Sequence, residues 1–194
     1  MHKYHAHAAT DVTGFGLLGH LGKMTKASGV DAVEENLLLW LDATNINGIG
    51  NVGLANGDIV NEWKDLSGNG HHVSTTGTGP ALVSNRLNNN DGLEFNGSGM
   101  LSRLDDDSLT FTQSPHTIIA VTKPDETAEN DFVGTNAAGA GNALVMFYNS
   151  RLRGHAWHGT NSNTIDSVTL PAVGQVYIAE QHVTETDISL YLNI

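Results

Sequence analysis

From residue 36 onward, short apolar or alternating segments follow one another and are separated by turns rich in Gly and Asn. Ile59 to Trp63 alternates apolar and polar residues, as a half-buried strand does. Thr117 to Lys123 is apolar along nearly its whole length, which predicts a central strand covered on both faces. The short, regular spacing predicts an antiparallel β-sandwich. Strands are predicted at 36–42, 59–63, 80–87, 93–96, 100–104, 109–112, 117–123, 132–133, 143–148, 152–158, 164–170, 175–183 and 188–194.

The first 35 residues have a different pattern. Apolar residues there recur at helical spacing and predict one amphipathic helix that ends at about residue 27. These residues are Leu17, Leu18, Leu21 and Met24. The chain is therefore predicted to consist of a helical leader, residues 1–35, and one all-β domain, residues 36–194.

Three motifs mark the first part of the β region: LLLWLDA at 37–43, DLSGNG at 65–70 and DGLEFNGS at 91–98. With these motifs, residues 36–194 resemble the laminin-G-like jelly roll, the fold of concanavalin A-like lectins and glucanases. The resemblance implies a two-sheet antiparallel jelly-roll sandwich. This fold serves binding modules, enzymes and structural domains alike, so it does not by itself assign a function.

The leader contains a second motif, HAATDVTGFGLLGH at 7–20. It closely resembles a motif of selenophosphate synthetase, and the resemblance implies that Asp11 helps to hold magnesium and the phosphates of ATP. That enzyme also needs a Gly-rich loop with a catalytic Cys or selenocysteine and a Lys, further aspartates and two α/β domains, which this chain does not fit. Asp11 is therefore interpreted as a capping or solvated turn residue, and the leader as a fragment of that family.

Composition narrows the classes of partner. The 194 residues include 21 acidic and 9 basic ones, a formal charge of -12, which argues against nucleic acid and anionic membranes as partners. The absence of Cys excludes disulfides, thiolate metal sites and a Cys nucleophile. No apolar run is long enough to span a bilayer. The composition is typical of extracellular or cell-surface domains, and the signal for export is expected to lie outside this chain.

The turn at 65–70 is a candidate metal site. Asp65, Ser67 and Asn69 offer oxygen ligands, and the glycines between them let carbonyl groups turn inward, as Ca²⁺ prefers. The alternative is that these side chains close the turn on its own backbone. The loop at 43–57 is long for a compact domain and is expected to be functional or clamped by an ion.

The best candidate for ligand binding is the strand at 152–158. Alternation places Arg153, His155 and Trp157 on one face, with Leu152, Ala156 and His158 on the other. An aromatic ring flanked by hydrogen-bonding side chains suits a sugar, and Tyr148 on the preceding strand adds a second ring. The alternative is that Trp157 faces the core and Arg153 lies along the rim.

An enzyme is the competing class. Glycosidases on this sandwich use a Glu-x-Asp-x-x-Glu strand, which is absent here, as are the GxSxG elbow and the HExxH zinc helix. The sequence therefore predicts a non-catalytic module that binds carbohydrate or a surface, with calcium as a candidate cofactor. The alternative is a structural or adhesive module that assembles with neighbouring proteins.

The resemblance implies at least one more strand after the C-terminal hairpin, which would pair beside the first strand. Without it a sheet edge is expected to be open, and an open edge invites pairing with another chain. The expected outcomes are a homo-oligomer, donation of a strand by another chain, or a sequence that is a shortened form of the domain.

Overall fold

Every element in the described part of the computed structural model is a β-strand, and the predicted all-β class is confirmed there. The structure describes residues 37–75, 77–97, 99–104, 109, 115–125, 130–135, 142–148, 151–158, 161–168 and 171–193. The predicted helical leader, with Asp11, and the predicted strand at 109–112 lie outside the described residues, apart from residue 109. Within the described ranges, no helix is long and apolar enough to cross a membrane.

The chain forms two compact units, residues 1–104 and 105–194, and each is described by itself. The first unit contains the leader and the start of the domain predicted for 36–194, and the second unit contains the rest of that domain. A single domain over 36–194 stays a prediction. In the first unit, β1 (Glu62–Trp63) pairs with β2 (Val73–Ser74), and β3 (Ala81–Leu87) pairs with β4 (Asn90–Glu94). Its core consists of Ile46, Val60 and Leu82, with Leu54, Trp63, Leu93 and Leu101 packed against them.

Asparagine side chains hold the long loop at 43–57. The backbone N–H of Ile46 donates to Oδ1 of Asn51 at 2.7 Å, and Nδ2 of Asn51 donates to the carbonyl of Ala43 at 2.8 Å. Asn51 has a φ of 60°, a conformation that Asn tolerates better than most residues. Oδ1 of Asn45 accepts from the N–H of Gly50 at 2.6 Å. The loop is thus closed by hydrogen bonds to asparagine side chains.

Three strands predicted in this unit are shorter or absent. Residues 37–42 are in no strand, because the N–H of Trp40 donates to Asp65 and its carbonyl accepts from Leu66, so neither bond belongs to a ladder. The segment at 59–63 is reduced to β1 and a bridge from Ile59 to Ala81. The segment at 100–104 is reduced to a bridge between Ser102 and Ser74.

The second unit contains two antiparallel sheets. The described strand orders are β11-β10-β5 and β6-β7-β8-β9. The strands are β5 (His116–Thr122), β6 (Asn130–Thr135), β7 (Asn142–Tyr148), β8 (Arg151–His158), β9 (Asn161–Asp166), β10 (Tyr177–Val183) and β11 (Ile188–Asn193). Strands β10 and β11 form the predicted C-terminal hairpin, in which the N–H of Thr184 donates to the carbonyl of Asp187.

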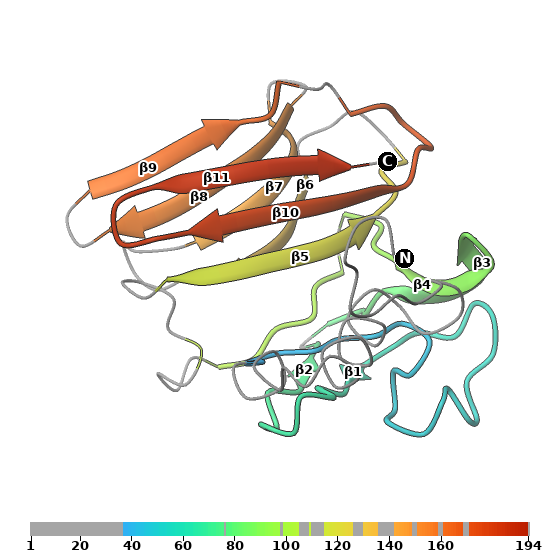
Figure 1. Cartoon of the computed structure of the whole chain (residues 1–194). Helices are drawn as coiled ribbons and strands as arrows, with labels where there is room; N and C mark the ends of the chain where they lie inside the picture. Colours follow the sequence, from blue (N-terminus) through green and yellow to red (C-terminus); the bar gives the residue numbers. More distant parts are fainter. Residues whose placement is uncertain are drawn as a thin grey trace, which may run out of the picture. The chain divides into compact units, whose positions relative to one another are not determined.

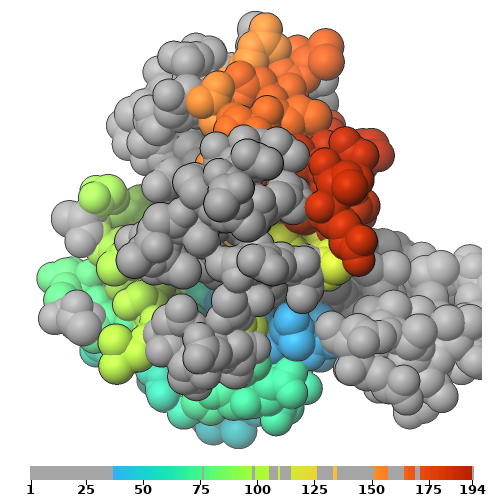
Figure 2. Space-filling view, turned by 90° about the vertical axis from the view of Figure 1, so that its left-hand side faces the viewer, coloured from blue at the N-terminus to red at the C-terminus, as the bar shows by residue number. Residues whose placement is uncertain are grey.

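The two sheets pack face to face. Figure 1 shows β5, β10 and β11 as one layer in front of β6 to β9, and β11 contacts both β8 and β9. In the space-filling view of Figure 2, residues of the β8–β9 region (orange) lie directly beside those of β10 and β11 (red). The core between the sheets is built on Leu152 and Ala179, with Ile118, Ala120, Val133, Leu190 and Leu192 against them.

Strand β5 differs from its predicted position. It was expected to be central and covered on both faces, but among the described strands it pairs only with β10, and Val121 is 46% exposed. Ile118 and Ala120 face the core, whereas Thr117 and Val121 alternate with them on the exposed side. A run of apolar residues does not distinguish a strand buried on both faces from one whose outer face carries apolar side chains.

Gly154 on β8 sets how closely the sheets approach. A Cβ atom there would lie 3.2 Å from Cδ1 of Ile188, 3.4 Å from Cγ2 of Ile165 and 3.4 Å from Cδ1 of Leu190. These are the ends of flexible side chains, so Gly154→Ala is expected to change the free energy of unfolding by less than about 1 kcal/mol, whereas Gly154→Leu should lower it by about 2–3 kcal/mol through overpacking. Denaturant unfolding of both variants checks this. Equal effects of the two substitutions would contradict the close approach.

Candidate functional site

The residues of β8 alternate between the core and the outer side of its sheet, as predicted. Leu152, Gly154 and Ala156 are buried, whereas Arg153 and His155 are partly exposed. Register with β9 is unbroken from Arg153, opposite Asp166, to His158, opposite Asn161. The structure therefore brings Arg153 and His155 together on the outer side. Trp157 lies on β8 and Tyr148 on β7, but their side chains are outside the described part of the chain.

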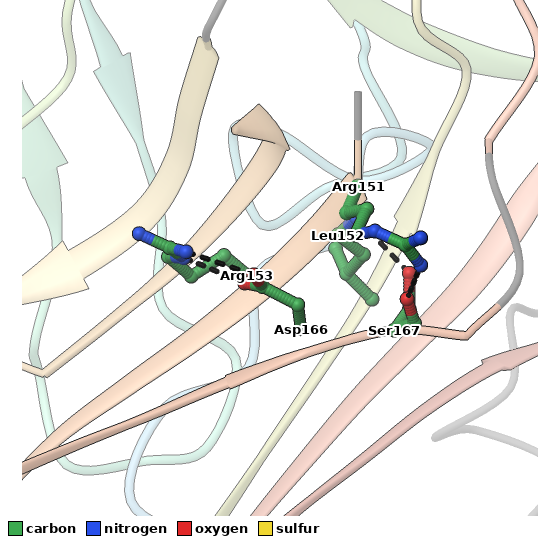
Figure 3. Close-up of polar contacts among 5 residues, drawn as sticks. All are labelled: Arg151, Leu152, Arg153, Asp166 and Ser167. Atoms are coloured by element: carbon green, nitrogen blue, oxygen red, sulfur yellow. Dashed lines mark hydrogen bonds and ion pairs between the residues drawn. The ribbon is translucent and has the colours of Figure 1, made fainter. Parts of the chain in front are cut away.

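Arg153 forms an ion pair with Asp166 across the strands (Figure 3). Nε donates to Oδ1 at 2.6 Å and an Nη donates to Oδ2 at 2.8 Å, so both carboxylate oxygens accept from one planar guanidinium. These hydrogen bonds, with the positive charges of Arg153 and Arg151, hold the pKa of Asp166 below its ordinary value of 3.8. The carboxylate and the guanidinium thus orient each other through two hydrogen bonds.

The beginning of β8 is tied to the residue that follows β9. Arg151 donates to the carbonyl of Ser167 at 2.6 Å, and the N–H of Leu152 donates to Oγ of Ser167 at 3.1 Å (Figure 3). From the other sheet, Nε2 of the buried Gln181 donates to the carbonyl of His155 at 3.1 Å. The backbone that carries Arg153 and His155 is thus held at its end and from the core side.

The second candidate site, the turn at 65–70, is built around the carboxylate of Asp65. Oδ1 accepts from the N–H groups of Trp40 (3.0 Å) and Ser67 (2.9 Å). Oδ2 accepts from the hydroxyl of Ser67 (2.7 Å) and the N–H of His71 (2.9 Å). Burial raises the pKa of Asp65, but the hydrogen bonds from Trp40, Ser67 and His71 outweigh it and hold the pKa below 3.8.

The other turn residues bind the segment that precedes them in the chain. Nδ2 of Asn69 donates to the carbonyl of Leu37 at 2.8 Å and to that of Leu38 at 3.2 Å. The hydroxyl of Ser67, which donates its one hydrogen to Asp65 at 2.7 Å, also lies 3.3 Å from the carbonyl oxygen of Leu38. The turn therefore works as a clamp on residues 37–40, an arrangement that was not expected from the sequence.

The side chains of this turn are engaged with the backbone in this arrangement, whereas a calcium ion takes six to eight oxygen ligands. Here both oxygens of Asp65 face N–H and O–H donors, and Asn69 presents its NH₂ group to carbonyl oxygens. Within the described residues, no group of three or more His, Asp or Glu side chains is placed to hold a metal ion.

Asp166 was not predicted as a site residue, because the strand after 158 was expected at 164–170, whereas β9 spans Asn161–Asp166. A hairpin that pairs His158 with Asn161 also pairs Arg153 with Asp166, since paired residue numbers in an antiparallel hairpin keep a constant sum. The signal was therefore the position of the turn between 158 and 161. Neither the hydrophobic pattern nor the composition contains that information.

A family model described as AIR synthase related protein, C-terminal domain, matches residues 1–44. This agrees with the resemblance of the leader to a selenophosphate synthetase fragment, and it covers 44 of the 194 residues. No curated protein and no solved structure matches the chain. Within the described end of the matched segment, Leu37, Leu38 and Trp40 are hydrogen-bonded to residues 65–71. The match therefore covers the leader and the first residues of the predicted β domain, and it does not extend to residues 45–194.

Proposed function

We propose that this chain is a non-catalytic carbohydrate-binding module of the cell surface or extracellular space, built on a laminin-G-like jelly-roll sandwich. The observation that carries the proposal is the outer side of β8 and β9, where the fixed Arg153–Asp166 pair lies beside the partly exposed His155. Sugar hydroxyl groups both donate and accept hydrogen bonds. A surface that holds guanidinium, carboxylate and imidazole groups at fixed positions suits several of them at once.

The architecture of the second unit supports the fold part of the proposal. Two antiparallel sheets packed face to face are the general plan of a jelly roll, and such a sheet presents a broad outer face to a ligand. Trp157, on the strand of Arg153 and His155, would supply the aromatic ring on which a sugar packs, with Tyr148 as a second ring. The proposal does not depend on calcium, since the side chains around β8 and not the turn at 65–70 carry it, and both oxygens of Asp65 accept hydrogen bonds.

A glycan array tests the function, with the full chain applied once with calcium and once with a chelator. Binding to the same glycans in both conditions is expected. Arg153→Ala should weaken binding of the strongest glycan by about tenfold, equivalent to about 1.4 kcal/mol, because it removes the guanidinium and leaves Asp166 without its partner. Arg86→Ala, which removes a partly exposed arginine of the first unit, is the matched control and should leave the affinity unchanged.

The possible results separate function from site. If no glycan binds in either condition, the carbohydrate function is wrong. If glycans bind but Arg153→Ala and Arg86→Ala behave alike, the function stands and the location on β8 is wrong. If the chelator abolishes binding, the site needs calcium and the expectation of equal binding in both conditions is wrong.

A second candidate function, a self-assembling structural module, is favoured by the strand order of one sheet. Strands β5 and β11 are the outer strands of the described order β11-β10-β5, and unpaired edges can extend a sheet into a second copy. Light scattering coupled to size-exclusion chromatography measures the mass in solution. A monomer at every concentration would exclude assembly, whereas a dimer or larger species that binds no glycan would favour it.

A further inference from the structure

The outer side of the β5-β10-β11 sheet carries an ordered set of side chains that the proposed site on β8 does not use. Five residues form it, and we refer to them as the Tyr191 face: Thr117 on β5, Glu180 and His182 on β10, and Tyr191 and Asn193 on β11. Their neighbours along each strand point the other way, since β10 alternates buried and partly buried residues and β11 alternates partly buried and exposed ones. The Tyr191 face is thus on the side of the sheet opposite the core.

Hydrogen bonds link these residues across all three strands. Nδ1 of His182 lies 3.0 Å from Oγ1 of Thr117, and Nε2 lies 3.3 Å from Oε2 of Glu180. Nδ2 of Asn193 donates to Oε1 of Glu180 at 3.4 Å. An ionised carboxylate only accepts, so in the neutral imidazole Nε2 carries the proton and Nδ1 accepts from the Thr117 hydroxyl. Each polar group is therefore oriented by a neighbour.

The same imidazole supports an aromatic ring. The rings of His182 and Tyr191 meet edge to face, with centroids 5.5 Å apart and an interplanar angle of 77°. Tyr191 nevertheless remains 52% exposed, which is high for a large aromatic side chain. A ring that is held in place yet open to solvent loses little conformational entropy when a ligand packs on it.

The charges on this face select the class of ligand. Glu180 is the one ionisable acid on β5, β10 and β11, and none of these three strands contains Lys or Arg. Together with the formal charge of -12, this disfavours sulfated or uronic-acid chains. Neutral hydroxyl groups, by contrast, can donate to the carboxylate oxygens and to the amide oxygen of Asn193.

From this geometry we infer that the Tyr191 face is a second carbohydrate-binding face, specific for neutral oligosaccharides. A sugar ring packs on Tyr191, and the adjoining hydroxyls bond to Glu180 and Asn193. Three strands span about 10 Å, which suits a short oligosaccharide better than a single ring. The ligand class, a carbohydrate, rests on the proposed function. The location does not depend on the site at β8, because the two packed sheets turn their outer sides in opposite directions.

Two faces directed apart would let one module join two glycan chains. Because the proposed site on β8 belongs to the other sheet, a ligand on the Tyr191 face would not compete with a ligand near Arg153. Linked binding of this kind raises overall avidity without any new contact.

The test uses the full chain labelled with ¹⁵N and titrated with the neutral glycan that gives the strongest array signal, or with cellohexaose if the array gives none. The backbone amides of residues 178–183 and 188–193 are expected to shift. Tyr191→Ala should raise the apparent Kd obtained from these shifts at least tenfold. Tyr191→Phe, which keeps the ring, should change this Kd by less than about threefold. Val173→Ala, at an exposed residue outside the strands, is the control for surface truncation. A hexamer of galacturonic acid should cause no shift.

Each result decides the inference. If the array detects ligands but the amides of β10 and β11 do not respond, or respond equally in Tyr191→Ala, the Tyr191 face is not a site and the proposed function is untouched. If neither the array nor the titration shows binding, the proposed function and the inference fail together. Equal response to the acidic hexamer would refute the specificity for neutral chains. Retained binding in Arg153→Ala that is lost in Tyr191→Ala would place the whole activity on this face.

Discussion

Replacing Asp65 with alanine is expected to lower the free energy of unfolding of the first unit by about 3–4 kcal/mol. The carboxylate is only 6% exposed and accepts four hydrogen bonds, three of them from backbone N–H groups. Its removal leaves the N–H groups of Trp40 and His71 without their acceptor and frees the segment at 37–40 from the clamp. Hydrogen exchange of peptides covering 37–42 and 65–72, measured with rising denaturant, reports this loss separately from the second unit.

Glu62→Ala is the matched control. Glu62 is also an acid of the first unit, but its side chain is 48% exposed and pairs with Lys64 at the surface, so its removal should cost less than about 1 kcal/mol. Equal losses for the two variants would mean that the charge of the unit, and not the clamp, determines the result.

The same carboxylate gives the clamp a pH dependence. Because the pKa of Asp65 is lower in the folded chain than its ordinary value of 3.8, its contribution to stability is fully present above about pH 4 to 5 and is lost as the pH falls through the lowered value. The difference in stability between the native chain and Asp65→Ala should therefore narrow in acid. A difference that stays constant from neutral pH down to pH 3 would contradict the lowered pKa.

Several strands of the second unit were predictable because short apolar or alternating segments recur there at regular spacing between turn residues. The predicted segments at 143–148 and 152–158 differ by one residue from β7 and β8. Residues 37–42 look the same by this criterion, yet they form no strand, because side chains of Asp65, Ser67 and Asn69 take up their backbone groups. A hydrophobic pattern reports which residues are covered, and it does not report whether a strand or a side chain supplies the hydrogen bonds.

The candidate sites show the same limit. Alternation correctly placed Arg153 and His155 on the side opposite Leu152, since that depends only on neighbours along one strand. The partner of Arg153 depends on the register between β8 and β9, which the position of one turn decides. To predict the Tyr191 face, the pairing of distant strands must also be known. His182 and Thr117 are 65 residues apart and meet only through the antiparallel pairing of β5 and β10.

Leu152→Ala is expected to lower the free energy of unfolding of the second unit by about 2–4 kcal/mol, because it opens a cavity at the centre of the contact between the two sheets. Leu152 is fully buried and packs with Ala179 and with apolar residues of both sheets. Val168→Ala, which truncates a 93% exposed side chain just beyond β9, is the control and should change stability by less than about 0.5 kcal/mol. Hydrogen exchange of peptides covering 151–158 and 177–183 measures both variants. This result also bears on the ligand faces: if Leu152 tolerates alanine without loss, that side of β8 is not in the core, and Arg153 and His155 cannot be assigned to the outer side.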